Sequence, residues 1–457
     1  MGSVRLLAFL CLVAVIGGVL ADAGEVGDQH LPLTDTVIQY GITWKLERPV
    51  RVGQFVSGDY YVVGPVTVVA VSPEPDEGRN GSVLNLPING KAGFDDRIEG
   101  DRYDATQAVE PPIRMKPGDS LISTVSVEKV RVLPRLLRHS DKASSPVKTA
   151  AVLTCLAEPA PVDAFRPSYC DTSNKIYLAR NLRRDLLPGL PRAKNTPKVS
   201  EWERIFERPW LDTVFDGYAM PVENGPAYGR ECARAAGNAT LLLCCDLPEK
   251  QKEQLLIKVV QVGIDLWGIV RAGHRGWPAH GGHGSGRKWL IVFAGIMLGD
   301  EDMQSPANKH PKVRFGEDMQ TMYGKCWTGA DVVYAGHVGK EGLKGRPDWG
   351  AYEHLPPSEW PGTLGESYRR CCTSVAWVGE ALAIRMLHAE KTWSHDAFLD
   401  YVDRWMTEDD TEHIRAIHEA NKGDYSASYL RQGQAWDRFV GEMWAKYRHH
   451  LPPAPAQ

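Results

Sequence analysis

A loop rich in glycine and histidine holds the residues of this chain that are best suited to chemistry. From Gly273 to Asp300 the sequence reads G-H-R-G-W-P-A-H-G-G-H-G-S-G-R-K-W-L-I-V-F-A-G-I-M-L-G-D. Glycine and proline interrupt regular structure, and the apolar run after Arg287 predicts a buried helix directly behind the loop. Binding and catalytic residues concentrate on loops that a rigid scaffold positions. We therefore expect His280, His283 and Arg287 to lie at the mouth of a helix, in the active site of an enzyme.

Arginine recurs at the start of three expected helices. The segments A-Y-G-R-E-C, G-S-G-R-K-W and E-S-Y-R-R-C carry Arg230, Arg287 and Arg369, and each is followed by small residues. Their uneven spacing excludes a solenoid of fixed period, but similar starts suggest equivalent inner helices of a ring. A helix N-terminus is already partly positive, so an arginine there suits an anionic ligand. The alternative is that each arginine pairs with a carboxylate such as Glu231 or Glu366.

Tryptophan is concentrated in the second half of the chain. Of 14 tryptophans, only Trp44 precedes residue 200, and Trp277, Trp349 and Trp360 lie in loops rich in glycine and proline. A flat aromatic face can stack on the apolar face of a sugar ring. The alternative is that these side chains pin their loops to the body of the protein.

The first part of the chain carries strand signals. The segments V-I-Q-Y-G-I-T-W, Y-Y-V-V-G-P-V-T-V-V-A-V and S-L-I-S-T-V-S-V are rich in β-branched and aromatic residues, as strands are. The turns R-N-G-S and I-N-G-K are typical of hairpins. We expect an antiparallel β-sandwich-like domain over residues 34–135. A linker and Pro-rich connecting segment follows over residues 136–200, and includes one more candidate strand, A-A-V-L-T-C-L-A.

From residue 201 onward the pattern is helical. Leu255, Val259 and Val262 recur three and four residues apart, which is the spacing of one helix face. Consecutive helices joined by short loops pack as antiparallel hairpins, so we expect an all-α toroid of helical hairpins over residues 201–450 and a disordered tail over 451–457. The expected helices cover about residues 228–245, 248–272, 287–298, 366–388, 395–406, 411–420 and 429–449.

The N-terminus predicts export. Arg5 precedes an apolar run from Leu6 to Val19, and small residues follow around Ala21 and Ala23. This pattern fits a secretory signal peptide over residues 1–23, and the run is short for a membrane span, which needs about 20 residues. We expect a secreted or periplasmic protein that has no membrane segment after cleavage.

Charge and cysteine content narrow the class further. The 457 residues carry a net charge of −4, which provides no basic field for nucleic acid. Of the nine cysteines, Cys11 lies in the expected signal peptide, so eight remain. An even number in an exported chain permits disulfides, and Cys155 with Cys170 is the favoured pair. Four others lie in apolar helical patterns, where buried thiols are expected: Cys244, Cys245, Cys371 and Cys372.

These features together resemble the α/α-toroid polysaccharide lyases, a group that includes alginate lyases and heparinase-like enzymes. The resemblance rests on export, a helical hairpin domain, a β domain on the same chain, and His, Tyr, Arg and Trp residues in loops. Such lyases often carry an adjacent Asn-His pair, which this sequence lacks. The nearest residues of those types are Asn224 and either His280 or His283. The β domain is also N-terminal here, whereas several of those families carry it after the toroid.

The resemblance implies β-elimination on a uronic-acid-containing polysaccharide, with no cofactor and no metal. A neutralised carboxylate makes the neighbouring C5 hydrogen more acidic, a base removes that hydrogen, and an acid protonates the leaving oxygen. An arginine fork suits the carboxylate. The expected catalytic residues are His280, His283, Arg287, Tyr228, Tyr352 and Tyr368. The expected binding residues for an anionic polysaccharide or oligosaccharide are Asn224, Arg230, Arg369, Trp277 and Trp349.

Three alternatives stay open. A glycoside hydrolase needs two carboxylates about the scissile bond, and Glu231, Asp348 and Glu353 are available. A zinc site could use histidines of the glycine-rich loop (His274, His280 and His283), although H-x-x-H without a nearby carboxylate is a weak signal. A non-catalytic carbohydrate-binding protein would need the tryptophans but not the titratable residues.

Overall fold

The computed structural model describes residues 31–129, 145–171, 173, 175–214, 217–226, 228–421 and 430–454. The expected signal peptide over residues 1–23 and the last three residues of the expected tail lie outside this range. The described residues from Leu31 onward belong to one compact unit.

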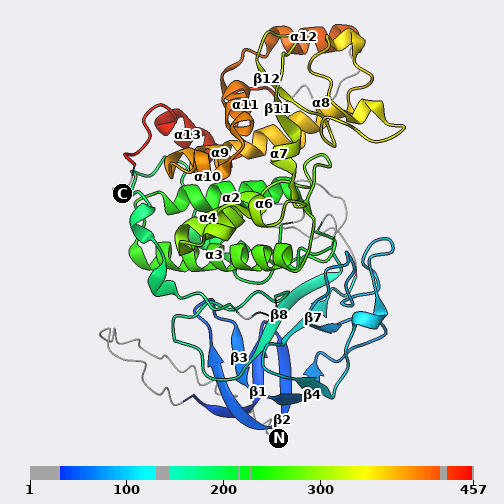
Figure 1. Ribbon diagram of the computed structural model, residues 1–457, viewed down its shortest axis with the longest axis vertical. Helices are drawn as coiled ribbons and strands as arrows, with labels where there is room; N and C mark the ends of the chain where they lie inside the picture. The colour runs from blue at the N-terminus through cyan, green and yellow to red at the C-terminus, as the bar shows by residue number, and fades with distance from the viewer. Residues whose placement is uncertain are drawn as a thin grey trace, which may run out of the picture. The chain divides into compact units, whose positions relative to one another are not determined.

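An eight-stranded sheet occupies the first part of the described chain (Figure 1). Seven strands follow the order β5-β7-β8-β3-β2-β4-β6, and β1 pairs with β2 outside that path. The strands are β1 (Leu33–Gln39), β2 (Ile42–Gln54), β3 (Tyr60–Val63), β4 (Val66–Ser72), β5 (Ser82–Leu84), β6 (Ile113–Met115), β7 (Ser120–Ser126) and β8 (Val147–Leu156).

The prediction of an antiparallel β-sandwich is wrong, because the strands form one mixed sheet that curls into a half-barrel. Strand β8 lies in the segment expected to be a connection, pairs antiparallel with β7, and runs parallel to β3. Strand β2 is long enough to join what would otherwise be two sheets. Its first half pairs with β4 and its second half with β3. Alternation of side chains along a strand predicts its two faces but not these pairings.

The sheet contributes to two hydrophobic cores. On one face Trp44 is fully buried with other residues of β2, β4 and β8. Its indole N–H donates to Ser123 Oγ at 2.9 Å, and Ser123 lies 2.7 Å from Ser82 Oγ. Other residues of β7 and β8, including Ile122 and Val152, belong to the same buried cluster as the helices. The sheet and the helices therefore share a continuous core.

Helices dominate the remainder of the chain (Figure 1). The periodic apolar face predicted in α3 is buried, including Leu255, Val259 and Val262. The helices are α1 (Val199–Glu203), α2 (Gly229–Leu243), α3 (Glu249–Arg271), α4 (Arg287–Leu298), α5 (Glu301–Gln304), α6 (Pro306–Lys309), α7 (Gly316–Gln320), α8 (Leu364–Tyr368), α9 (Val375–Met386), α10 (Glu390–Trp393), α11 (Asp396–Thr407), α12 (Thr411–Ala420) and α13 (Arg438–Tyr447). A π-helical segment, Arg369–Ser374, joins α8 to α9.

The prediction of an all-α toroid of consecutive hairpins is also wrong. Two small sheets interrupt the helices: β9 (Gly276–Trp277) runs parallel to β10 (Arg314–Phe315), and β11 (Thr321–Tyr323) runs antiparallel to β12 (Val332–Tyr334). Helix α2 packs most extensively against α9, which is distant in sequence. Gly237 and Gly379 permit this contact, because a Cβ at Gly237 would lie 2.8 Å from backbone atoms of Gly379.

A buried ion triad ties the sheet to helix α3. The Arg166 guanidinium lies 2.7 Å from Asp59, in the turn after β2, and 2.6 Å from Asp265 in α3. Arg166 is 1% exposed, so both carboxylates depend on it for charge compensation. In the part of the chain that the structure describes, no helix is both long and apolar enough to cross a membrane.

Candidate functional site

The glycine- and histidine-rich loop is pressed between the start of α2 and the π-helical segment. A Cβ at Gly282 would lie 2.2 Å from the carbonyl oxygen of Cys372. Gly286 has a φ of 93°, and a Cβ there would lie 2.3 Å from the backbone nitrogen of Ala233. Only glycine permits such close backbone approach and this left-handed conformation. The loop composition that marked the site in the sequence is thus a packing requirement.

Three histidines and two tyrosines from four segments meet at this loop. The ring centroid of His280 lies 5.3 Å from that of His283 and 5.0 Å from that of His337. Tyr228 packs edge-on against His283, and Tyr368 against His337, each with centroids 4.3 Å apart. We call these five residues the histidine–tyrosine cluster. His337 is buried, whereas the other four side chains are partly exposed.

Trp349 borders the histidine–tyrosine cluster. Its ring centroid lies 4.6 Å from that of His337 and 5.7 Å from that of His280. Exposed Arg346 stacks over the Trp349 ring, with 4.3 Å between the guanidinium carbon and the centroid. Arg346 also pairs with Asp348 at 3.1 Å, in a bridge whose arginine side chain is 50% exposed. An aromatic face and an exposed cation therefore flank the cluster.

The buried amide of Gln320, at the end of α7, holds two loops of the site together. Its Nε2 donates to the carbonyl oxygens of Gly281 and His337, both at 2.9 Å. The Gly281 N–H also donates to the His337 carbonyl oxygen at 2.8 Å. Burial, together with the neighbouring His280 and His283, lowers the pKa of His337 to about 3. His337 is therefore a neutral imidazole at neutral pH.

Tyr228 has a structural bond to the loop. Its phenolic oxygen accepts the N–H of Gly282 at 2.9 Å. Burial raises the pKa of Tyr228 above its usual range, so the phenol keeps its proton. Tyr228 therefore supports the loop that carries His280 and His283.

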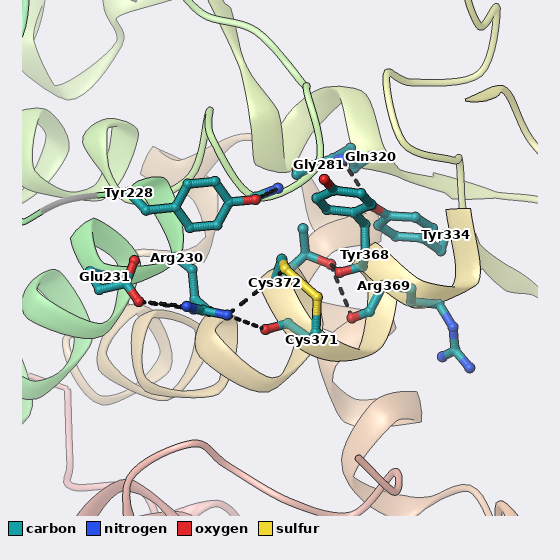
Figure 2. The surroundings of a disulfide bond; sticks show 12 residues. Tyr228, Arg230, Glu231, Gly281, Gln320, Tyr334, Tyr368, Arg369, Cys371 and Cys372 are labelled. Carbon is teal, nitrogen blue, oxygen red and sulfur yellow. Dashed lines mark hydrogen bonds and ion pairs between the residues drawn. A yellow bond between two sulfur atoms is a disulfide. The ribbon is translucent and has the colours of Figure 1, made fainter. Parts of the chain in front are cut away.

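All three helix-start arginines are engaged by carboxylates. Arg230 pairs with Glu231 at 2.8 Å, and Arg369 pairs with Glu366 at 2.7 Å. Figure 2 shows the Arg369 side chain directed away from Arg230. These are the carboxylates that the sequence offered as the alternative to an anionic ligand. Each of the two arginines is 5% exposed or less.

Arg287 binds the backbone of the glycine- and histidine-rich loop. It lies 2.6 Å from Asp212 and donates to the carbonyl oxygens of His283 at 2.7 Å and Ser285 at 2.9 Å. Burial opposes its charge, but Asp212 outweighs burial, so the pKa of Arg287 is raised above its usual range. Arg287 therefore stabilises the loop as a permanent, fully paired cation.

Three other expected site residues lie outside the cluster. Tyr352 is buried and donates to Glu366 Oε2 at 2.6 Å. Asn224 is buried and donates to the carbonyl oxygens of Ile205 and Arg208, both at 3.2 Å. Trp277 is 7% exposed. It lines a pocket of about 110 Å³ that also includes His283 and Asp212.

The residue that the sequence reading missed is His337. It lies in the segment Y-A-G-H-V-G, directly after β12. A histidine flanked by glycine is the same signal that marked His280 and His283, so the pattern could have included it. Its distance along the chain from that loop concealed the relationship.

A disulfide joins Cys371 to Cys372 within the π-helical segment (Figure 2). The expected buried thiols at these positions are therefore wrong. The expected Cys155–Cys170 bond is also wrong, because both residues are free thiols. Arg230 donates to the Cys371 carbonyl oxygen at 2.9 Å, and its Nη1 lies 3.9 Å from Cys372 Sγ.

A buried carboxyl pair lies behind the loop. Glu317 accepts the Gly286 N–H at 2.6 Å, and burial raises its pKa to about 7. Both side-chain oxygens of Glu380 in α9 are buried without a hydrogen-bond partner among the described residues. Burial and the neighbouring Glu317 raise the pKa of Glu380 well above its usual range. Both effects favour the neutral form of the Glu380 carboxyl group.

The carboxylates available for a hydrolase are engaged elsewhere. Glu231 and Asp348 pair with neighbouring arginines, and Glu353 pairs with Arg404 at 2.8 Å. His274 accepts the Gly276 N–H through Nδ1 at 3.2 Å. Among the described residues, no three His, Cys, Asp or Glu side chains are placed to hold a metal ion.

Comparisons with known proteins provide no family for this site. The chain matches no protein-family model, no curated protein and no solved structure. Its function must be argued from the residues themselves.

Proposed function

We propose that the protein is a carbon–oxygen lyase that cleaves uronic-acid-containing polysaccharide by β-elimination at the histidine–tyrosine cluster. The observation that carries this proposal is the meeting of three imidazoles and two phenols in one partly exposed group. β-Elimination needs one group that takes a proton and one that gives it, both close to the same sugar ring. Imidazole and phenol can perform both tasks when their pKa values are tuned.

Exposure and bonding divide the roles within the cluster. Tyr368 is partly exposed and lies over His337, so its phenol is the group that we assign to proton transfer. His280 and His283 are partly exposed on the glycine-rich loop. We assign one of them to removal of the C5 proton and the other to neutralisation of the sugar carboxylate. His337 is neutral and buried, and it orients Tyr368. Tyr228 holds the loop through Gly282.

The substrate carboxylate needs a cation that is accessible. Arg230, Arg287 and Arg369 are buried in ion pairs, so the proposal assigns them to support of the site. Arg346 is exposed, stacks over Trp349, and is paired with Asp348 in an exposed bridge. Exposed bridges contribute little to stability, so Arg346 can exchange Asp348 for a sugar carboxylate. Trp349 would offer its face to the neighbouring sugar ring.

The alternative enzyme, a glycoside hydrolase, has less support. It requires two carboxyl groups facing one bond, and Glu231, Asp348 and Glu353 are each held by an arginine. A purely carbohydrate-binding protein needs neither a cluster of three histidines nor a histidine whose pKa is lowered, as that of His337 is. The lyase therefore accounts for more of the site.

A panel of uronic-acid polymers tests the proposal. The protein is incubated with alginate, polygalacturonate, hyaluronan and heparin, and absorbance of the unsaturated product is followed together with new reducing ends. The proposal predicts that both signals rise in parallel on at least one polymer. Reducing ends without that absorbance would identify a hydrolase, and binding without either signal would leave a carbohydrate-binding protein.

A further inference from the structure

The Cys371–Cys372 disulfide is not explained as a stabilising cross-link. A disulfide that restricts the unfolded chain stabilises more as the loop that it closes becomes longer, and this one joins adjacent residues. The other described cysteines are all free thiols: Cys155, Cys170, Cys232, Cys244, Cys245 and Cys326. The bond therefore affects mainly the conformation of the backbone around it. It is the one disulfide among the described residues.

That local structure carries the histidine–tyrosine cluster. The disulfide lies in a π-helical segment, a form that is rare and often found at functional sites. Gly282 packs directly on the Cys372 carbonyl, and a Cβ at Gly281 would lie 2.4 Å from the ring of Tyr368. Thr373 Oγ1 donates to the Tyr368 carbonyl oxygen at 3.2 Å. A shift of the Cys371–Cys372 backbone therefore reaches both the histidine loop and Tyr368.

The surroundings of the two sulfur atoms favour thiol exchange. Cys372 is 7% exposed, whereas Cys371 is partly exposed, so an external thiolate meets Cys371 Sγ first. Attack there releases Cys372 as the leaving thiolate. The Arg230 guanidinium lies 3.9 Å from Cys372 Sγ (Figure 2), and a nearby cation stabilises a leaving thiolate.

We propose that Cys371–Cys372 is a reducible modification site through which a dithiol lowers the activity of the histidine–tyrosine cluster. The first thiolate attacks Cys371 Sγ, breaks the Cys371–Cys372 bond and forms a mixed disulfide. The second thiol of the reagent then displaces Cys371. The dithiol is oxidised to its own disulfide, and two electrons and two protons end on the two cysteines. Once unbonded, the two sulfur atoms move apart and displace Gly282 and Tyr368.

Thiol labelling tests the chemical step without any substrate. The native full-length protein is alkylated before and after treatment with dithiothreitol, and the labelled peptides are mapped. Cys371 and Cys372 should be labelled only after reduction. The Arg230→Gln variant should be reduced about tenfold more slowly than wild type, and Arg230→Lys should be affected less. Labelling of both cysteines without reductant, or an unchanged rate in Arg230→Gln, would overturn the proposal.

A second measurement tests the coupling to the cluster. Reduction of wild type should shift the imidazole resonances of His337 and lower turnover about tenfold, whereas dithiothreitol should change neither in Cys371→Ser/Cys372→Ser. If that double variant does not fold, Cys371→Ala serves instead, since it also lacks the bond. Complete reduction with unchanged His337 resonances contradicts the proposal. The turnover arm rests on the proposed lyase function, but the labelling and resonance arms do not, so the two failures are distinguishable.

Discussion

His337 and Tyr368 meet edge to face in the candidate site, with ring centroids 4.3 Å apart. His337 follows β12, and Tyr368 ends α8 immediately before the π-helical segment. The imidazole is buried and neutral, and the phenol is partly exposed. The pair therefore places a partly exposed phenol against a buried, neutral imidazole.

The amide that fixes His337 should matter for both stability and turnover. Gln320→Leu removes the hydrogen bonds to the Gly281 and His337 carbonyl oxygens. The His337 carbonyl oxygen keeps the Gly281 N–H, but the Gly281 carbonyl oxygen loses the amide donor. This loss should cost about 1–3 kcal/mol of unfolding free energy, measured by denaturant titration, and turnover should fall. Gln304→Leu, which loses one bond to the Gly295 carbonyl at 3.2 Å, serves as control. Equal loss of turnover in both variants would count against a special role for Gln320.

The ion triad between sheet and helix should be required for folding stability. Arg166→Met leaves Asp59 and Asp265 buried without their cation, which should cost about 3–5 kcal/mol. Arg180→Met, at an exposed pair with Asp163, should have a small effect. Thermal and denaturant unfolding of the two variants give the comparison. A small effect of Arg166→Met would mean that another group compensates the two carboxylates.

The buried carboxyl pair predicts a pH dependence of stability. Because the folded pKa of Glu380 is raised, the unfolded chain ionises first as pH rises above the usual glutamate pKa of about 4.3. The folded state should therefore lose stability with rising pH, by about 1 kcal/mol per unit for each such group. Glu380→Gln should flatten this slope, because the glutamine side chain cannot ionise. The substitution should break no hydrogen bond, because the Glu380 carboxyl group makes none among the described residues.

Unfolding free energies between pH 5 and pH 8 measure that slope. Glu412→Gln changes an exposed carboxylate paired with Arg415 and is the matched control. A slope that is the same in Glu380→Gln and wild type would show that Glu380 is already ionised in the folded protein.

Local patterns predicted the helices better than the pairings between elements. The expected helices over about residues 248–272 and 287–298 correspond to α3 and α4, because a periodic apolar face is a local property. The sandwich failed because the position of β8 between β7 and β3 is set by contacts across the sheet. The prediction of a helical ring was wrong for a similar reason. Helix α2 packs against α9 at Gly237 and Gly379, and this contact between distant segments is not visible in local sequence patterns.

Four of the five residues in the histidine–tyrosine cluster were among those that the sequence singled out. Glycines next to histidines marked the loop, and His280 and His283 do lie together with Tyr228 and Tyr368. The arginines were harder to interpret, because an ion pair depends on where a distant carboxylate lies. Arg287 pairs with Asp212 from another segment, which no local spacing indicates.

Turnover in two cluster variants tests the central claim most directly. On a uronic-acid polymer that wild type cleaves, His337→Gln and Tyr368→Phe should each lower the rate of unsaturated-product formation by about a hundredfold or more. Tyr368→Phe keeps the ring against His337 and removes only the phenolic oxygen. His449→Gln, at an exposed position near the C-terminus, should leave the rate unchanged. Near wild-type rates in both folded cluster variants would contradict the account and place the active site elsewhere.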